Sequence, residues 1–145
     1  MTRVLATGTF DIIHPGHIYF LEQARALGDE LWVIVARDST VRHKPTPVIP
    51  ERQRLAMVSA LRVVDHAVLG DEKDMLAPVE RIRPDVIALG HDQYFDEDEL
   101  RHQLAERGIR ARVVRIGGKL DGELFSGERI RRRIREHGEE NGGQG

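Results

Sequence analysis

The side chains best suited to chemistry lie in one segment, Thr7-Gly-Thr-Phe-Asp-Ile-Ile-His-Pro-Gly-His17. A glycine stands where a predicted strand ends, and two imidazoles stand three residues apart where a helix is predicted to begin. Exposed backbone amides and the positive end of a helix dipole favour an anion, and each imidazole can donate a hydrogen bond to a developing negative charge. The segment therefore predicts a phosphate site, with phosphoryl or nucleotidyl transfer as its chemistry.

Two other interpretations of this segment stay open from the residues alone. Gly8 and Gly16 can serve turns while the histidines act as surface or capping residues. Asp11, His14 and His17 can also be zinc ligands, although the chain has no cysteine and no evident fourth ligand. The common nucleotide loops are absent, because there is no G-x-G-x-x-G and the pair at 118–119 lacks the rest of a P-loop.

The composition limits the classes of protein to consider. With 145 residues, 40% hydrophobic and 32% charged, the chain suits one domain with one core. A net charge of -2 argues against a nucleic-acid-coating protein. No apolar run approaches the roughly 20 residues of a membrane span, and no secretory signal is evident. We expect a cytoplasmic protein with neither nucleic acid nor membrane as partner.

Short β-branched runs alternate with longer amphipathic stretches, which predicts parallel strands joined by crossover helices. The predicted strands are residues 4–7, 31–36, 66–69, 86–89 and 112–116. The predicted helices follow Pro15, begin near Pro50, cover 75–82 and 96–107, and start after an N-cap at Ser126. Right-handed crossovers then favour an α/β, doubly wound, five-stranded parallel sheet in the order 3-2-1-4-5. We predict a single domain over residues 1–135 and a polar, disordered tail over 136–145.

This topology predicts where a ligand binds. The chain reverses direction between the first and fourth strands, and ligands of such sheets bind outside the carboxyl ends of the strands at that reversal. Residues 8–17 and 90–93 are therefore expected to face one crevice. The loop over residues 38–49 is long for such a unit, which favours a functional role.

Gly8-Thr-Phe-Asp followed by His14-Pro-Gly-His17 resembles the nucleotidyltransferase (cytidylyltransferase-like) superfamily, whose signature is H-x-G-H. The resemblance runs from Arg3 to about Ile134 and implies a Rossmann-like fold with a nucleoside triphosphate at the reversal point. The stretches 33–38, 49–54 and 89–93 look more like archaeal-type FAD synthases than like glycerol-3-phosphate cytidylyltransferases. That resemblance implies transfer of AMP from ATP to FMN, giving FAD and pyrophosphate, with a divalent metal, most simply magnesium, and a homodimer.

The resemblance also implies a role for individual residues. The implied catalytic residues are His14, His17 and Lys44. The implied nucleotide-binding residues are Thr9, Phe10 (through its backbone amide), His14, His17, Arg54, Gly90, Asp92, Ser126 and Arg129. The implied metal ligands are Asp11 and Asp38. Against these roles stand a solvated loop lysine for Lys44, a helix surface charge for Arg54 and a turn aspartate for Asp92.

The chain departs from the family in the motif that opens its last helix. Only Ser126 keeps a hydroxyl there, because Gly127 and Glu128 occupy the next two hydroxyl positions. Glu128 brings a carboxylate near the pyrophosphate unless it turns outward or meets a metal. This departure leaves open a nucleotide-binding module without catalysis. The family resemblance leaves open a second alternative to FAD synthesis, a CTP-dependent cytidylyltransferase for glycerol-3-phosphate or a similar phospho-alcohol.

Overall fold

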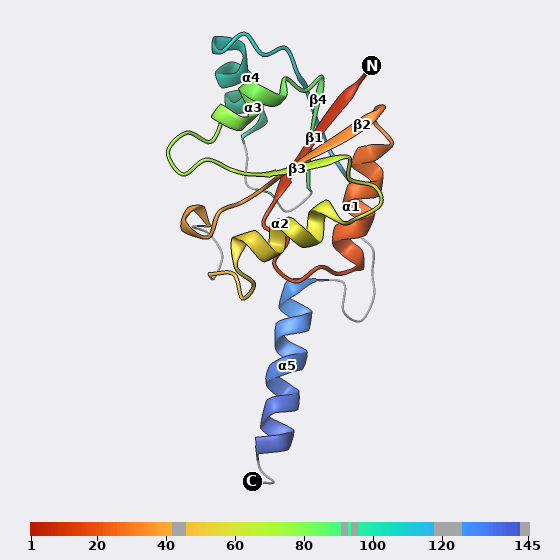
Figure 1. Ribbon diagram of the computed structural model, residues 1–145, viewed down its shortest axis with the longest axis vertical. Coiled ribbons are helices and arrows are strands. Elements are labelled where there is room, and N and C mark those ends of the chain that lie inside the picture. Colours follow the sequence, from red (N-terminus) through yellow and green to blue (C-terminus); the bar gives the residue numbers. More distant parts are fainter. Residues whose placement is uncertain (42–45, 91–92, 94–95, 118–125, 143–145) are drawn as a thin grey trace.

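The computed structural model describes residues 1–41, 46–90, 93, 96–117 and 126–142, which form a sheet with helices on both faces (Figure 1). The strands are β1 (Arg3–Gly8), β2 (Glu30–Val35), β3 (His66–Leu69), β4 (Val86–Leu89) and β5 (Arg112–Arg115). The helices are α1 (Pro15–Arg25), α2 (Glu51–Ser59), α3 (Ala77–Ile82), α4 (Glu97–Glu106) and α5 (Gly127–Gly142), with a 3-10 turn at Asp38–Thr40.

The sheet confirms the predicted topology. All four strand pairs are parallel, and the order is β3-β2-β1-β4-β5. Leu5 at the centre of β1 pairs with Trp32 of β2 on one side and Ile87 of β4 on the other. The carboxyl ends of β1 and β4 therefore lie next to each other, and the loops that follow them meet at one edge of the sheet.

Two apolar layers hold the helices against the sheet. On one face, Leu21 of α1 and Val58 of α2 belong to the same core as Val4 of β1. On the other face, Val79 of α3 and Leu104 of α4 belong to the core that contains Leu5. Neighbouring residues of β1 point into opposite layers and both are fully buried, which explains the unbroken apolar run over residues 4–6.

The last helix differs from the sequence prediction. Ser126 is the N-cap of α5, as predicted, and the N–H of Arg129 donates to its Oγ at 3.1 Å. The helix then runs to Gly142, so residues 136–142 are helical where a disordered tail was predicted, and the predicted domain limit at residue 135 falls inside α5. Arg and Glu are good helix formers, and pairs such as Glu128 with Arg132, four residues apart and 3.1 Å between charged atoms, stabilise an exposed helix.

Within the described ranges, no helix combines the length and the apolar character that crossing a bilayer requires.

Candidate functional site

The two imidazoles of the H-x-G-H element cap the start of α1. The N–H of Gly16 donates to His14 Nδ1 at 3.1 Å, and the N–H of His14 donates to His17 Nδ1 at 3.3 Å. The two rings stack with their centroids 3.7 Å apart. A ring nitrogen that accepts a hydrogen bond carries no proton, so each neutral ring holds its proton on Nε2. The capping therefore sets two adjacent Nε2–H donors at the N-terminus of a helix, where an anion is favoured.

The turn between β1 and these histidines is held by Phe10. Its backbone lies in the left-handed region with φ of 53°, and its side chain is 3% exposed. The ring packs edge-on to His17 at 5.3 Å and lies over Gly8, where an added Cβ would come within 2.8 Å of it. Gly8 is thus needed because the aromatic ring approaches the backbone closely.

Arg54 lies fully buried beneath this loop, with no exposed surface. Its Nε donates to Ile49 O at 2.8 Å, and its Nη1 donates to Thr9 O at 2.8 Å and to Ala36 O at 2.7 Å. The structure therefore places Arg54 neither on the helix surface nor in open space facing a ligand. Its guanidinium joins the loop after β1, the end of β2 and the segment before α2.

Asp38 completes the environment of Arg54. Its Oδ1 accepts from Arg54 Nη2 at 2.6 Å, and its Oδ2 accepts from the N–H of Glu51 at 3.3 Å. Glu51 reciprocates, since its Oε1 accepts from the N–H of Asp38 at 3.0 Å. Asp38 thus balances the buried charge of Arg54 and caps the start of α2.

Asp11, in the loop after β1, is buried against the segment that precedes α2. The N–H groups of Val48 and Ile49 donate to its oxygens at 3.0 and 2.9 Å, and Arg131 of α5 donates to its Oδ2 at 2.6 Å. Burial alone opposes ionisation of this carboxyl, but these three hydrogen bonds and the charge of Arg131 outweigh it, so the pKa of Asp11 lies below its ordinary 3.8.

Both predicted metal ligands are already bound by donors of the protein. Asp11 already accepts three hydrogen bonds, and both oxygens of Asp38 are engaged by α2. Among the residues that the structure describes, no group of three or more His, Asp or Glu side chains could hold a metal ion. Asp11, His14 and His17 therefore do not form a zinc site, while magnesium at Asp11 and Asp38 stays a prediction.

The loop after β4 is tied to the carboxyl end of β1. The N–H of Gly90 donates to Gln93 Oε1 at 2.7 Å, and Gln93 Nε2 donates to Thr7 O at 2.8 Å. Arg115 of β5 donates to the carbonyls of Gly90 and Gln93 at 2.8 and 3.0 Å. The roles of the Gln93 and Arg115 side chains were not predicted, since a glutamine in a loop and an arginine ending a strand carry no distinctive pattern.

The start of α5 reaches the same site through Arg131, which sequence analysis also did not single out. Glu128 turns outward, with its side chain 76% exposed and paired with Arg132. The carboxylate in the departing motif therefore points away from the loop. Lys44 and Asp92, two further predicted site residues, lie outside the described residues.

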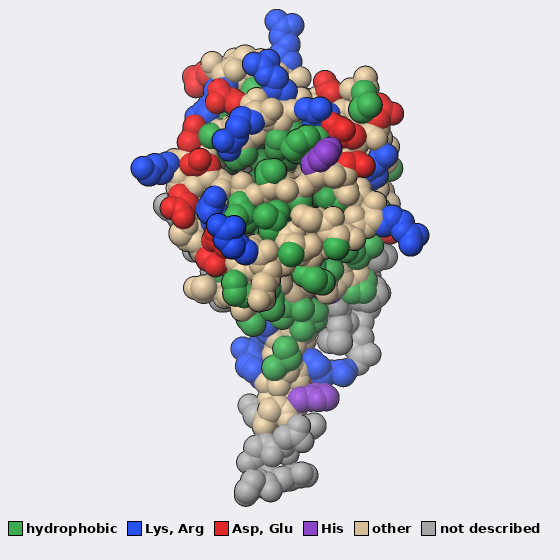
Figure 2. Space-filling model, in the orientation of Figure 1, with side chains coloured by type: hydrophobic (Ala, Val, Ile, Leu, Met, Phe, Trp, Pro, Cys, Tyr) green, Lys and Arg blue, Asp and Glu red, His purple; other side chains and the backbone are tan. Residues whose placement is uncertain are grey.

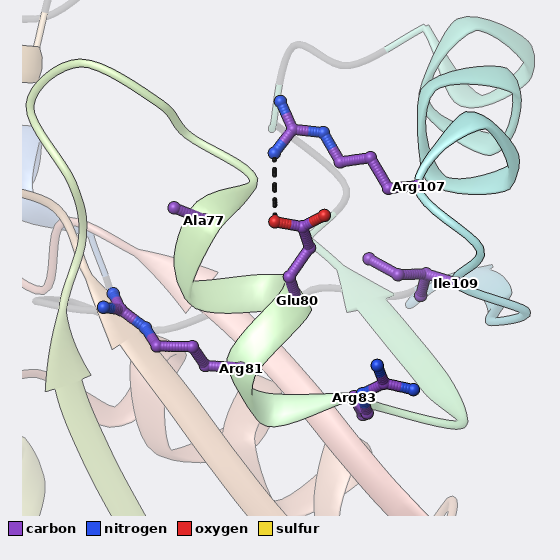
Figure 3. Close-up of a pocket in the computed structure, with 6 residues that line it drawn as sticks. All are labelled: Ala77, Glu80, Arg81, Arg83, Arg107 and Ile109. Carbon is purple, nitrogen blue, oxygen red and sulfur yellow. Dashed lines mark ion pairs between the residues drawn. The ribbon is translucent and has the colours of Figure 1, made fainter.

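A separate cavity of about 410 Å³ lies beside α3 and contains none of the predicted site residues (Figure 3). Glu80 and Arg107 face each other across it with charged atoms 3.5 Å apart, and Arg83 lies nearby with φ of 51°. Two of the charged side chains that line this cavity are thus paired with each other, and the cavity is distinct from the edge where β1 and β4 end.

Residues 5–133 match the family model described as cytidylyltransferase-like. The chain belongs to the cytidylyltransferase-like family. This confirms the resemblance read from the H-x-G-H element, and the stacked histidines at the start of α1 are this member's version of that element.

The relatives of this cytidylyltransferase-like chain include curated FAD synthases. That of Methanoregula boonei is 64% identical over 132 residues, which cover 91% of this chain and 89% of that protein. That of Methanohalophilus mahii is 61% identical over 136 residues, covering 94% and 96%. A solved structure from Thermoplasma volcanium, described as a lipopolysaccharide core biosynthesis protein, is 52% identical with a TM-score of 0.79, covering 83% of this chain and 99% of that one.

We expect Arg54→Met to destabilise this cytidylyltransferase-like fold by about 3–5 kcal/mol, because it leaves Asp38 and three carbonyls without their buried donor. Arg52→Met, on the exposed side of the same helix, serves as the control and should change stability by less than about 0.5 kcal/mol. Urea unfolding measures both. A stable Arg54→Met protein with weakened nucleotide binding would instead make Arg54 a ligand-contacting residue.

Proposed function

We propose that this chain is an FAD synthase that transfers AMP from ATP to FMN and releases pyrophosphate. The observation that carries the proposal is the stacked pair of Nε2–H donors at the N-terminus of α1, which begins at the carboxyl edge of β1 and β4. The 64% identity to the FAD synthase of Methanoregula boonei supports the choice of ATP and FMN.

The reaction is a direct displacement. An oxygen of the FMN phosphate attacks the α-phosphorus of ATP, a new P–O bond forms, and the bond from that phosphorus to the bridging oxygen breaks. The electron pair leaves with pyrophosphate. No protein nucleophile is needed, so the site acts by positioning the reactants and stabilising charge.

The proposed roles are supported by where each residue lies. His14 and His17 donate from Nε2 to the phosphate oxygens as charge shifts onto them. Thr9 and Phe10 shape the turn that faces the triphosphate, and Gly90 leaves room for the nucleoside at the end of β4. The N-terminal end of α5 offers its amides and the charge of Arg129 to the leaving phosphates, and Ser126 caps this end of the helix.

Lys44 and Asp92 are proposed from the sequence resemblance alone, as a contact to the α-phosphate and to the nucleoside. Magnesium is proposed as part of the substrate, MgATP, since Asp11 and Asp38 are already engaged by protein donors. A cytoplasmic location likewise stays a prediction from the sequence.

The test is pyrophosphate release by the purified protein with magnesium, crossing ATP and CTP with FMN, glycerol-3-phosphate and no acceptor. We expect release with ATP that depends on FMN, together with a product that has the mass of FAD. Release from CTP with glycerol-3-phosphate would replace the proposal by the cytidylyltransferase alternative. Tight ATP binding without release in any combination, with manganese and cobalt also tried, would indicate a binding module.

We expect His17→Ala to lower kcat by roughly 10²- to 10³-fold, because it removes one donor aimed at the developing charge. His102→Ala is the matched control: this histidine is 74% exposed on α4 and pairs with Glu106, far along the chain from the site. Steady-state rates of both variants, with circular dichroism to verify folding, decide the matter. Near-normal turnover of His17→Ala would remove the central residue of the mechanism.

We also propose a homodimer that uses the face of β2 and β3 bearing Trp32, His66 and Val68. Trp32 and Val68 stay only partly buried at the border of one core, the Trp32 ring lies tilted against exposed His66 with centroids 4.3 Å apart, and β3 is an edge strand. Hydrophobic side chains spread over the middle of the body in the view of Figure 2.

Light scattering should give a mass of twice the 16.5 kDa of one chain. Val68→Arg should halve this mass, while Met75→Arg, at an exposed position near α3, should leave it unchanged.

A further inference from the structure

We propose that Asp11 is a positioning residue, which through its ion pair with Arg131 holds the first turns of α5 against the loop that carries His14 and His17. The inference rests on the proposed function in one respect, namely that α5 presents its amides to the leaving phosphates. It assigns Asp11 a role other than metal ligation.

The ion pair between Asp11 and Arg131 joins residues 120 positions apart in the chain. Arg131 Nη2 lies 2.6 Å from Asp11 Oδ2, and the Asp11 side chain is only 7% exposed while that of Arg131 is 33% exposed. An ion pair with one nearly buried partner is screened less by water than a surface pair. This contact can therefore fix the place of a helix, which a fully exposed pair does not do.

Asp11 is a rigid anchor because it is itself held from two sides. The N–H groups of Val48 and Ile49 bind its two oxygens, and the carbonyl of Ile49 in turn accepts from buried Arg54. Asp11 thus cannot follow α5 if the helix shifts. The ion pair therefore fixes the position of α5 relative to the loop after β1.

The departing motif at the start of α5 fits this role. A Cβ added at Gly127 would lie 3.2 Å from Arg131 Nη1, so the missing side chain leaves space for the guanidinium one turn later. Glu128 leans outward to Arg132 and does not compete with Asp11 for Arg131. Gly127 and Glu128, which remove two hydroxyls from the family pattern, are therefore compatible with a docked helix.

Beyond the latch formed by Asp11 and Arg131, α5 leaves the body of the protein. Figure 1 shows the helix projecting away from the sheet, and Ile134 is 59% exposed. An amphipathic helix with so little of its length packed depends strongly on the few contacts near its start. Loss of the ion pair should therefore loosen the segment that carries Ser126 and Arg129.

The test is amide hydrogen exchange of α5 in the full chain without substrate. Arg131→Gln and Asp11→Asn should each speed exchange over residues 129–134 by about tenfold, as expected for loss of one charge-assisted bond. Arg132→Gln, which breaks only the exposed pair with Glu128 one residue along, should leave exchange unchanged. Arg131→Lys, which keeps the charge, should restore part of the protection.

Two further measurements separate positioning from general stability. The double variant Asp11→Asn, Arg131→Gln should exchange no faster than the worse single variant, because both remove the same contact. In steady-state assays Arg131→Gln should raise KM for ATP about tenfold and change kcat less than about threefold, unlike His17→Ala. If Asp11→Asn fails to fold, Arg131→Gln and Arg131→Lys alone still decide the outcome, since Arg131 is partly exposed.

Unchanged α5 exchange in a folded Arg131→Gln protein would overturn the latch, and so would additive effects in the double variant. These exchange measurements need no turnover. A chain that releases no pyrophosphate with ATP and FMN but shows the expected exchange would refute the proposed function and keep the latch.

Discussion

A guanidinium without exposed surface must have its charge balanced and its N–H groups bound inside the protein, and this requirement organises the site edge of the sheet. Arg54 meets it with carbonyls of Thr9, Ala36 and Ile49 and with the carboxylate of Asp38. These partners come from the ends of β1 and β2 and from the segment before α2. Three loops that have no strand pairing of their own thus share one buried cation, which fixes their relative positions.

Above Arg54, backbone N–H groups orient the two histidine rings. Each Nδ1 accepts from a main-chain N–H, so the ring orientation and the tautomer are set before any substrate arrives. Preorganised donors of this kind stabilise charge without the cost of reorientation during the reaction. Gln93 orders the loop after β4, because its side chain accepts from the N–H of Gly90 and donates to the carbonyl of Thr7 at the carboxyl end of β1.

Patterns that depend on periodicity and local chemistry were readable from the sequence. Apolar strands, an N-cap at Ser126 and a strand order dictated by handedness all follow from short-range rules, and the structure confirms them. Residues whose roles depend on distant partners were not readable. Arg54 looks like its exposed neighbour Arg52 until the fold buries it, and Arg131 looks like any member of an arginine-rich run until the fold brings Asp11 to it. Polar composition also misled the prediction of a disordered tail, because charged residues form exposed helices readily.

The separation of Asp11 and Arg131 by 120 residues makes folding and competence two separate events. Every strand of this sheet precedes α5, and both apolar layers consist of residues that come before this helix. The two layers can therefore be buried while α5 is still undocked. A chain with a finished sheet is still an incomplete site until Arg131 has found its carboxylate.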